Sequence, residues 1–401
     1  SFKMPLCPVP LNSNNVVVSY AFQSNCEELD PNPVFKPLSF TGGIPAITRD
    51  VLQSAELDGT SEITNIRLGS FAVAGESNVE LKAGVHDDML EACMQSAWVT
   101  GETLASATVT IDADLRTATV TGVDLTSQVN VNDYVAFTEL TGYNSKAHLV
   151  TSITFSTDTV ITFGAAKVAN PQTGRVGLID ESAASVGKTS DYINVGTQRK
   201  PFAMLIEHKD LDDTDRYVLI MDCEVTQFSF NPSVNANITG SFSIIGKTMA
   251  SGIPLPTGAT FDTQASKKPL TGIDGSIVSA GARIAFSESM TFSLNRNGEA
   301  SYEIGSKYMA FIDYGKATNE VSITSKFVNF DIQQKFEAET NVDYSFAAEL
   351  DGDLLAFQWP NCLLTGVDRT IGEGVIPQEL TIFPYKPAGA TSSLTIRRMA
   401  A

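Results

Sequence analysis

The sequence has little positive charge, and it has no long apolar run. Its 401 residues include 27 Lys and Arg against 46 Asp and Glu, which gives a formal net charge of -19. A chain this acidic repels nucleic acid, so the composition disfavours a DNA- or RNA-binding role. It leaves open a role in which DNA must pass without sticking. No apolar stretch approaches the length of roughly 20 residues that a membrane-spanning helix needs.

Cysteine is scarce and unpaired by spacing. The five cysteines are Cys7, Cys26, Cys93, Cys223 and Cys362, and no two of them have CxxC spacing. This pattern argues against a disulfide framework or a zinc site, and it predicts free thiols in a reducing compartment. The stretch "SFKMPLCPVPLNSNN" lacks the basic-then-apolar pattern of a signal peptide. We therefore expect the protein to be made and assembled in a cytoplasm.

Side chains that carry catalysis are also few. The three histidines, His86, His148 and His208, lie in different segments without ligand-spaced partners. "SVGKTS" imitates the end of a phosphate-binding loop, but the glycine it needs would fall at Ser182. We expect a flexible loop there, and we expect no catalytic residues, no metal and no cofactor.

Strand-like stretches dominate what is present. "NNVVVSYAF", "RYVLIMDCEVTQFSF" and "ITGSFSIIGK" are rich in Val, Ile, Phe and Thr and are bounded by Gly or Asn. In the last of these, apolar and polar residues alternate, which is typical of a half-buried strand. The apolar set is Ile238, Phe242 and Ile244, and the polar set is Thr239, Ser241 and Ser243.

One short helix is predicted in "VHDDMLEACMQSA", where apolar residues from Val85 to Cys93 recur at helical spacing. Asp87 and Asp88 fall in its first turn, where the helix dipole favours acidic side chains. Trp98 at the helix exit is interpreted as an anchor in the core or at an interface.

The chain repeats itself. "NIRLGSFAVAGESNVELKAGVHDDMLEACMQ" aligns with "KYMAFIDYGKATNEVSITSKFVNFDIQQKFEAE", and both continue into a hairpin and a last strand. The shared order of elements indicates a duplicated unit. The alignment pairs Phe71 with Phe311, Gly75 with Gly315, Val79 and Leu81 with Val321 and Ile323, and Met94 with Phe336.

These patterns predict a mainly β protein of two tandem units with an inserted all-β domain. The expected segments are an arm (1–35), a first unit (36–101 and 181–250), an insertion (102–180), a linker (251–269), a second unit (270–390) and a tail (391–401).

The stretch from Val51 to Trp98 resembles the tail tube, or major tail, proteins of long-tailed (siphovirus-like) bacteriophages. The family pattern is a Ser-x-Glu turn, an Arg-x-Gly stretch, a V-x-G strand pair and an acidic helix start ending near a tryptophan. The matching residues here are Ser54 and Glu56, Arg67 and Gly69, Val73 and Gly75, Asp87 to Glu91, and Trp98. "PVFKPLSFTGG" and "SVNANITGSFSIIGKTM" are similar to that family as well.

The resemblance implies a β-sandwich or barrel unit flanked by one helix, whose sheets join side by side into a ring and so pair their exposed edges. Six units per ring is the family norm, so a chain with two units is expected to form a homotrimer with pseudo-sixfold symmetry. Rings would stack into a tube, with the arm and the loops around 42–62 reaching the next ring, and the insertion lying outside. Tail terminator and tail tip proteins would cap the tube, and the tape measure protein and DNA would pass through it.

Residues that line the channel are predicted from strand alternation. Val79 and Leu81 face the core, so their neighbours face away, either into the channel or into ordinary solvent. The candidates in the two copies are Asn78, Glu80, Lys82, Glu320, Ser322 and Thr324.

Other hypotheses stay open at this point. The chain could be a virion or surface β-protein whose insertion recognises a host ligand. It could be an enzyme, although no arrangement of nucleophile and base is visible. A tube protein of a contractile tail or a secretion system would share the fold.

Overall fold

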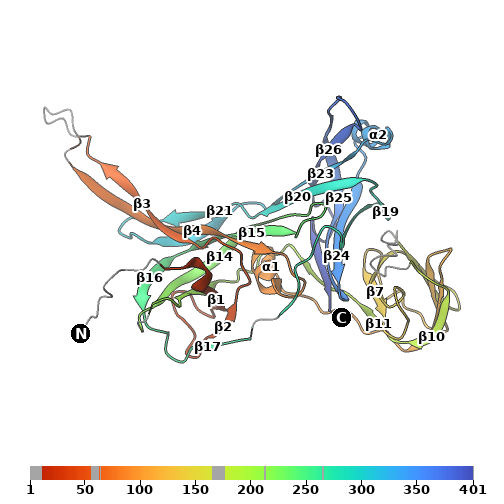
Figure 1. The fold of residues 1–401 in the computed structure, drawn as a ribbon, viewed down its shortest axis with the longest axis horizontal. Coiled ribbons are helices and arrows are strands. Elements are labelled where there is room, and N and C mark those ends of the chain that lie inside the picture. Colours follow the sequence, from red (N-terminus) through yellow and green to blue (C-terminus); the bar gives the residue numbers. More distant parts are fainter. Residues whose placement is uncertain are drawn as a thin grey trace.

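The computed structural model describes residues 11–55, 63, 65–164, 177–211, 214–263 and 266–400. The described chain is mainly β, as predicted, with two α-helices, α1 (Asp87–Met94) and α2 (Asp331–Glu337), and a 3-10 turn, η1 (Ser13–Asn15). Most strands belong to one 18-stranded sheet, and a separate 7-stranded sheet lies beside it (Figure 1).

The first repeat consists of α1 and two strand layers that share the long strand β14 (Tyr217–Asn231). The outer layer holds β2 (Val34–Pro37), β1 (Val16–Phe22), β13 (Phe202–His208), the first half of β14 and β16 (Thr248–Ile253). The inner layer holds β3 (Ala46–Gln53), β4 (Ile66–Glu80), β15 (Thr239–Gly246) and the second half of β14. The short β17 (Thr260–Phe261) runs parallel to β2.

The second repeat has the same plan around the long strand β25 (Asp353–Arg369). Its outer layer holds β19 (Ala282–Arg283), β18 (Gly275–Ser279), β24 (Val342–Leu350), the first half of β25, β27 (Thr395–Met399) and β12 (Asp191–Asn194). Its inner layer holds β20 (Ser287–Asn295), β23 (Thr318–Lys326), β26 (Pro377–Pro384) and the second half of β25, and β21 (Gly298–Tyr302) and β22 (Met309–Tyr314) form a hairpin.

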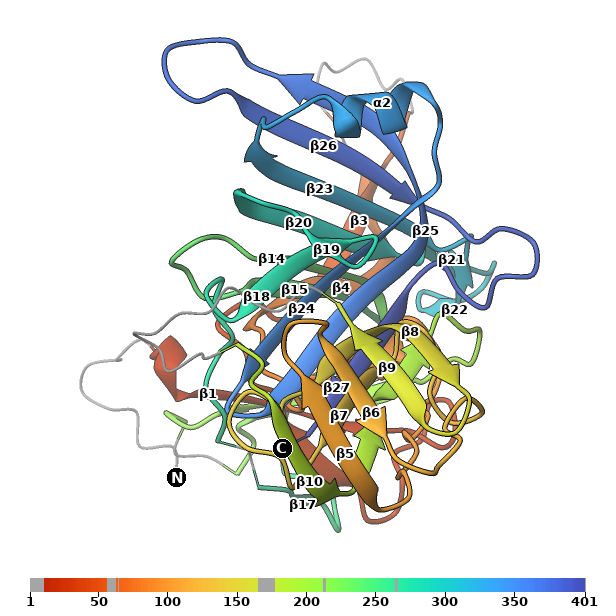
Figure 2. The ribbon, with the colours of Figure 1, turned by 90° about the vertical axis from the view of Figure 1, so that its right-hand side faces the viewer.

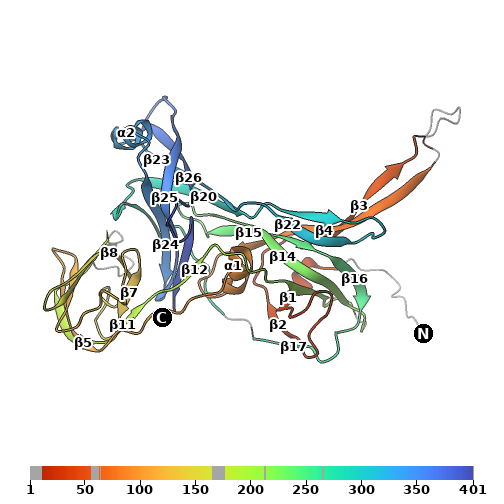
Figure 3. The ribbon, with the colours of Figure 1, turned by 180° about the vertical axis from the view of Figure 1, so that it is seen from behind.

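The insertion forms the 7-stranded sheet, with its own apolar core, together with residues 181–189, which were expected in the first unit. Its strands are β10 (Glu181–Ser185), β5 (Ala107–Asp112), β6 (Thr117–Val120), β9 (Thr159–Phe163), β8 (His148–Phe155), β7 (Tyr134–Phe137) and β11 (Gly187–Thr189). Figure 3 shows this sheet and the β3–β4 hairpin at opposite ends of the molecule.

The duplication is visible in matching irregularities of the two long strands. The β14–β15 ladder shifts register at Thr226, and the β25–β26 ladder shifts at Thr365. Three residues before each bulge lies a buried cysteine, Cys223 or Cys362, whose thiol donates to the carbonyl three residues earlier. A bulge adds one residue to one strand at a fixed place, so two bulges in equivalent ladders fix the correspondence of the repeats.

That correspondence corrects the alignment made from sequence. Following the ladders outward from the bulges, Phe242 matches Leu380, and their partners in the next strand are Ser77 and Ile323. Ile323 therefore matches Ser77, whereas the sequence alignment paired it with Leu81. The slip is four residues. An even slip preserves which side chains face inward, so the alternation was interpreted correctly although the equivalences were wrong.

Three segments differ from the expected organisation. The expected arm, 1–35, contains a core strand in its described part, because β1 pairs with β13 over seven residues; residues 1–10 lie outside the described residues. The segment 391–401 is not a free tail, because β27 pairs with both β25 and β12. The loop expected around "SVGKTS" is built of β10, β11 and β12. Serine, alanine and glycine have little strand preference of their own, so the strands around "SVGKTS" form because they pair with neighbouring strands.

The two repeats share one hydrophobic core. Phe228 and Phe230 of β14 contact Phe292 and Phe357 of the second repeat, with ring centroids between 4.4 and 6.3 Å apart. The inner layers also join directly, because β14 pairs with β20. Figure 2 shows β26, β23, β20, β14 and β15 as successive strands.

A polar sheet face as the candidate functional site

The joined inner strands present one continuous polar face. Cross-strand partners point to the same side of a sheet, so rows of paired residues can be followed from β4 across to β25. We call this surface the polar face. Two rows cross from β4 to β23: Glu76, Ser243, Gln227, Asn295 and Thr318, and beside them Asn78, Ser241, Ser229, Ser293 and Glu320. Two further rows cross from β20 to β25: Thr291, Ser322, Thr381 and Gly366, and beside them Ser289, Thr324, Glu379 and Asp368. At one end of the face, Glu80 lies opposite Thr239.

Strand alternation explains how the sequence produces this face. Each residue of the rows is exposed or half-buried, whereas the residues between them are mostly buried. "MTFSLN" places Met290, Phe292 and Leu294 in the core and sends Thr291, Ser293 and Asn295 to the polar face. The apolar side stabilises the sheet by burial, which leaves the opposite side free to carry a chosen chemistry.

The chemistry of the polar face is hydroxyl and carboxylate. Hydroxyl groups bond across strands, as between Ser229 Oγ and Ser241 Oγ at 2.9 Å. Ser322 Oγ donates to Glu379 at 3.1 Å. The face carries the carboxylates Glu76, Glu80, Glu320, Glu379 and Asp368. The rows contain no Lys or Arg, so they carry a net negative charge. Lys326 lies at the margin of the face and forms an ion pair with Glu288 at 2.9 Å.

Five of the six residues predicted to line a channel belong to this face: Asn78, Glu80, Glu320, Ser322 and Thr324. Lys82 does not, because β4 ends at Glu80 and the Lys82 ammonium donates to Ser39 Oγ at 2.9 Å. Whether the face lines a channel stays a prediction. Sequence reasoning did not nominate Ser229, Ser293, Glu379 or Asp368, although the same alternation runs through their strands.

Of the predicted interface residues Asp87, Asp88 and Trp98, the structure brings Asp87 and Trp98 together around Arg398 of β27. Arg398 donates to Asp87 and lies over the Trp98 ring, 4.2 Å from its centroid. Burial raises the pKa of the Asp87 carboxyl, and Arg398 opposes that rise. Asp88 accepts from Lys36 at 2.6 Å. Asp87 and Trp98 thus join α1 to the second repeat within one chain, whereas Asp88 joins α1 to β2 of the first repeat. A role of these residues between chains stays a prediction.

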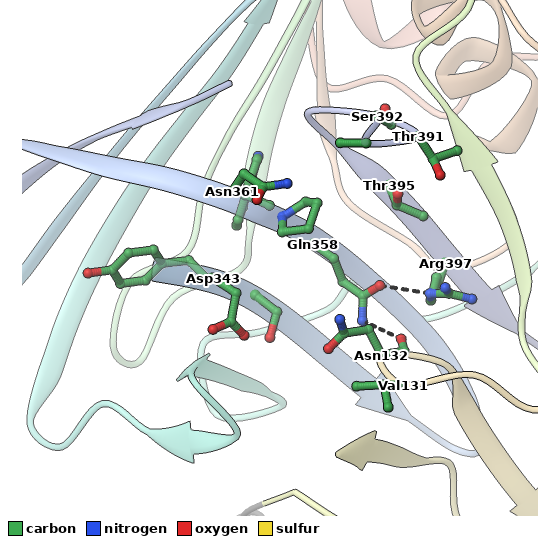
Figure 4. Close-up of a pocket in the computed structure, with 14 residues that line it drawn as sticks. Val131, Asn132, Asp343, Gln358, Asn361, Thr391, Ser392, Thr395 and Arg397 are labelled. Atoms are coloured by element: carbon green, nitrogen blue, oxygen red, sulfur yellow. Dashed lines mark hydrogen bonds between the residues drawn. The ribbon is translucent and has the colours of Figure 1, made fainter. Parts of the chain in front are cut away.

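A cavity of about 290 Å³ lies between the inserted sheet and the second repeat. Gln358 bridges its two sides, since its amide donates to the Asn132 carbonyl at 2.8 Å and accepts from Arg397 at 2.7 Å (Figure 4). Trp359 also contributes to the lining, and its side chain is fully buried. Among the described residues, its indole N–H has no hydrogen-bond partner. Most of the residues that line the cavity are polar, among them Asn132, Asp343 and Arg397.

In the part of the chain that the structure describes, no helix is long and apolar enough to span a bilayer.

A broad polar face supported by a shared aromatic core is the architecture of a structural β-protein that presents a surface. Residues 13–382 match the family model described as "Phage tail tube protein", and the chain belongs to that family. It is therefore a structural component of a phage virion and not an enzyme, as the sequence predicted.

No curated protein sequence matches the chain. One solved structure, phage phi92 endosialidase, is 11% identical over 99% of this chain and 60% of that chain, with a TM-score of 0.14. A likeness this weak carries no argument about fold or activity.

Proposed function

We propose that three copies of this chain close into a ring with pseudo-sixfold symmetry, and that the rings stack into the hollow tube of a phage tail. The observation that carries this proposal is the polar face, which crosses both repeats without a break. A sheet that continues from one repeat to the next can continue from one chain to the next, and closure would leave no free strand edge.

The polar face would line the channel. Its carboxylates repel the phosphates of passing DNA, and its hydroxyl groups bond with one another and with water, so the wall does not hold the polymer. The tape measure protein would occupy the same channel before DNA enters it. Tail terminator and tail tip proteins would cover the end rings, and assembly would take place in the host cytoplasm.

The β3–β4 hairpin supports stacking between rings. It projects far from the body of the molecule (Figure 1), and every residue of β3 is exposed. Leu52, Ile66 and Leu68 are each more than half exposed on it. Covering one such side chain contributes about 1.5–3 kcal/mol, so a second ring is the partner that would make this hairpin stable. β3 lies within the loops around 42–62, which the sequence named together with residues 1–35 as candidates for reaching the next ring.

Negative-stain electron microscopy of the purified protein tests the proposal over a concentration series. End-on views of hollow rings with threefold symmetry and a pseudo-sixfold outline are expected. Sixfold rings of whole chains would keep the tube and overturn the trimer. The variant Leu52→Asp/Leu68→Asp is expected to form fewer or shorter tubes because it charges the hairpin, and Leu115→Asp, an exposed leucine of the inserted sheet, serves as its control.

A second candidate function rests on the cavity beside Gln358, which favours the recognition of a small polar ligand by the inserted domain. Binding of a sugar panel by the wild type, lost in Gln358→Leu, would support it. A protein that binds a glycan and stays monomeric at every concentration would move the conclusion from a tube to a binding module.

A further inference from the structure

The described sheet has an open edge at its far end. The second half of β14 is paired on both sides, with β15 and with β20. The equivalent half of β25 is paired with β26 on one side only, and no described strand covers Gly366–Arg369 on the other. Because the repeats are equivalent, the strand that covers β14 indicates what is missing beside β25.

The covering strand β20 has a counterpart at the other end of the same chain. The bridge between Gly42 and Asn78 and the pair of Ala46 with Ala74 continue one ladder along β4. Asn78 matches Thr324, whose partner in β20 is Ser289. Gly42 therefore matches Ser289, and counting along both strands matches Ile47 to Leu294.

The hairpins confirm this correspondence independently. The β3–β4 ladder shifts register between Arg49 and Val51, after which Val51 pairs with Leu68. Across the gap after β20, Gly298 pairs with Tyr314. The residues that match Val51 and Leu68 by counting are the same Gly298 and Tyr314, so the two hairpins have one register.

The junction inside the chain then gives the register of a junction between chains. Phe228 of β14 lies opposite Leu294 of β20, and both are buried. Their counterparts are Val367, half-buried at the open edge, and Ile47, which is 42% exposed. The buried apolar pair Phe228 and Leu294 thus has a counterpart in Val367 and Ile47. These two residues are not buried, and they lie at opposite ends of the sheet.

A polar contact follows the same rule. Beyond the strand pairing, Arg296 reaches the end of α1, where it donates to Gln95 Oε1 and to the Gly196 carbonyl. The residue that matches Arg296 is Arg49, which is exposed. Gln95 follows α1 in the left-handed conformation, with φ 50°, and Glu339 follows α2 with φ 48°. The counterpart of an arginine–glutamine contact is thus an arginine and a glutamate.

The exposure of the helices agrees with a missing neighbour. In α1 five residues are buried, whereas none is buried in α2. Near α2, Val328 and Phe330 are more than half exposed.

We infer that the β14–β20 junction is an internal copy of the contact between subunits. The edge Gly366–Arg369 of one copy pairs antiparallel with Pro45–Thr48 of the next, Ile47 covers Val367, and Arg49 forms an ion pair with Glu339. The two surfaces differ, so the contact is head-to-tail, and in the proposed ring it repeats at each boundary between chains. The inference rests on the proposed tube and specifies its partner as a second copy of this chain.

Cysteine cross-linking tests the register. In a background with Cys7→Ser and Cys26→Ser, the variant Ile47→Cys/Val367→Cys is treated with a short bismaleimide after assembly, and the same sample is imaged. Covalent species of two and three chains are expected, and none from either single variant. Tubes without cross-links would overturn this contact and leave the proposed function standing. A wild-type chain that forms no ring or tube under any condition would overturn both.

Charge reversal tests the ion pair. Arg49→Glu and Glu339→Arg are each expected to raise the concentration needed for assembly by about tenfold, since each places like charges together. The double variant is expected to restore assembly. Lys268→Glu, which reverses an exposed lysine in a different pair, is the control. Equal effects of Arg49→Glu and Lys268→Glu, or no rescue in the double variant, would overturn the pair.

Discussion

The buried ion pair between Arg397 and Asp133 fastens the inserted sheet to the second repeat. The two groups are 2.8 Å apart, and their side chains are 12% and 10% exposed. Burial lowers the pKa of the Arg397 guanidinium, and Asp133 opposes that change. A buried charge that loses its partner is costly, whereas an exposed pair contributes little.

Asp133→Asn is therefore expected to lower the free energy of unfolding by about 3–5 kcal/mol. Asp351→Asn, which breaks the exposed pair with Lys268, is the matched control and is expected to cost less than about 1 kcal/mol. Urea unfolding followed by fluorescence measures both. Equal, small losses would show that Arg397 finds another partner or water.

His148 makes the stability of the inserted sheet depend on pH. Its ring is buried between Tyr143 and Phe163, and its Nε2 lies 3.0 Å from the Tyr143 carbonyl. Burial lowers the pKa of His148 to about 4, against about 6.5 in an unfolded chain. Between these values the unfolded state binds the extra proton, so stability is present above pH 6.5 and falls as the pH drops towards 4.

At pH 5 this group is expected to cost about 2 kcal/mol relative to pH 7. In His148→Gln, which keeps a donor for the Tyr143 carbonyl, the difference in unfolding free energy between pH 7 and pH 5 is expected to shrink by that amount. Parallel pH profiles of the two proteins would contradict the assignment.

At the residue scale, what the sequence could predict was side-chain direction. Alternation alone placed Asn78, Glu80 and Ser322 away from the core, because one face of these strands must be buried. The ion pairs of Arg397 and Arg398 could not be assigned, since their acidic partners lie more than 200 residues away along the chain. No local pattern encodes such a contact.

At the scale of elements, the aromatic cluster ties β14 to the second repeat. The Phe230 ring lies 5.2, 5.4 and 4.4 Å from those of Phe292, Phe346 and Phe357. The core is therefore shared between repeats, and we expect the repeats to unfold together.

Phe230→Ala is expected to destabilise both repeats by about 3–5 kcal/mol and to leave a single transition for them. Phe311→Ala, at a phenylalanine that is 53% exposed, is expected to change stability by less than about 0.5 kcal/mol. Calorimetry measures the number of unfolding transitions, and fluorescent probes attached to each repeat show whether the two repeats unfold at the same temperature. Two separate transitions would mean that each repeat holds a core of its own.

Strands and helices could be predicted where apolar residues alternate or recur at helical spacing. They could not be predicted where a segment becomes a strand only because it pairs with a neighbouring strand. α1 was expected from its apolar spacing and acidic first turn, and it forms at Asp87–Met94. β10 and β11 were not expected, because "ESAAS" and "GKT" have no apolar rhythm and become strands only against β5 and β7. The register of the repeat was also beyond reach, since two β-units align almost equally well at several even offsets.

At the scale of the whole molecule, part of the net charge of -19 is located on one surface, the polar face. Acidic residues are spread over the surface, but on the polar face they lie in rows that contain no Lys or Arg, and Lys326 beside these rows is paired with Glu288. If that face lines the channel, a charge reversed by one substitution is present in every chain, and so it is repeated around each ring and along the tube. A single substitution would then line the channel with basic groups, and DNA would adhere to it with the salt dependence of phosphate contacts.

Glu320→Lys tubes are therefore expected to retain short duplex DNA at low salt and to release it as salt is raised, because ion screening weakens each contact. Glu102→Lys makes the same change in net charge at an exposed residue that leads into the inserted sheet, and its tubes are expected to retain no more DNA than the wild type. Co-sedimentation of labelled DNA with tubes measures both. Equal retention would place Glu320 on an outer wall. Retention by Glu320→Lys alone would mean that the surface next to DNA is the one that strand alternation in both repeats turns away from the core.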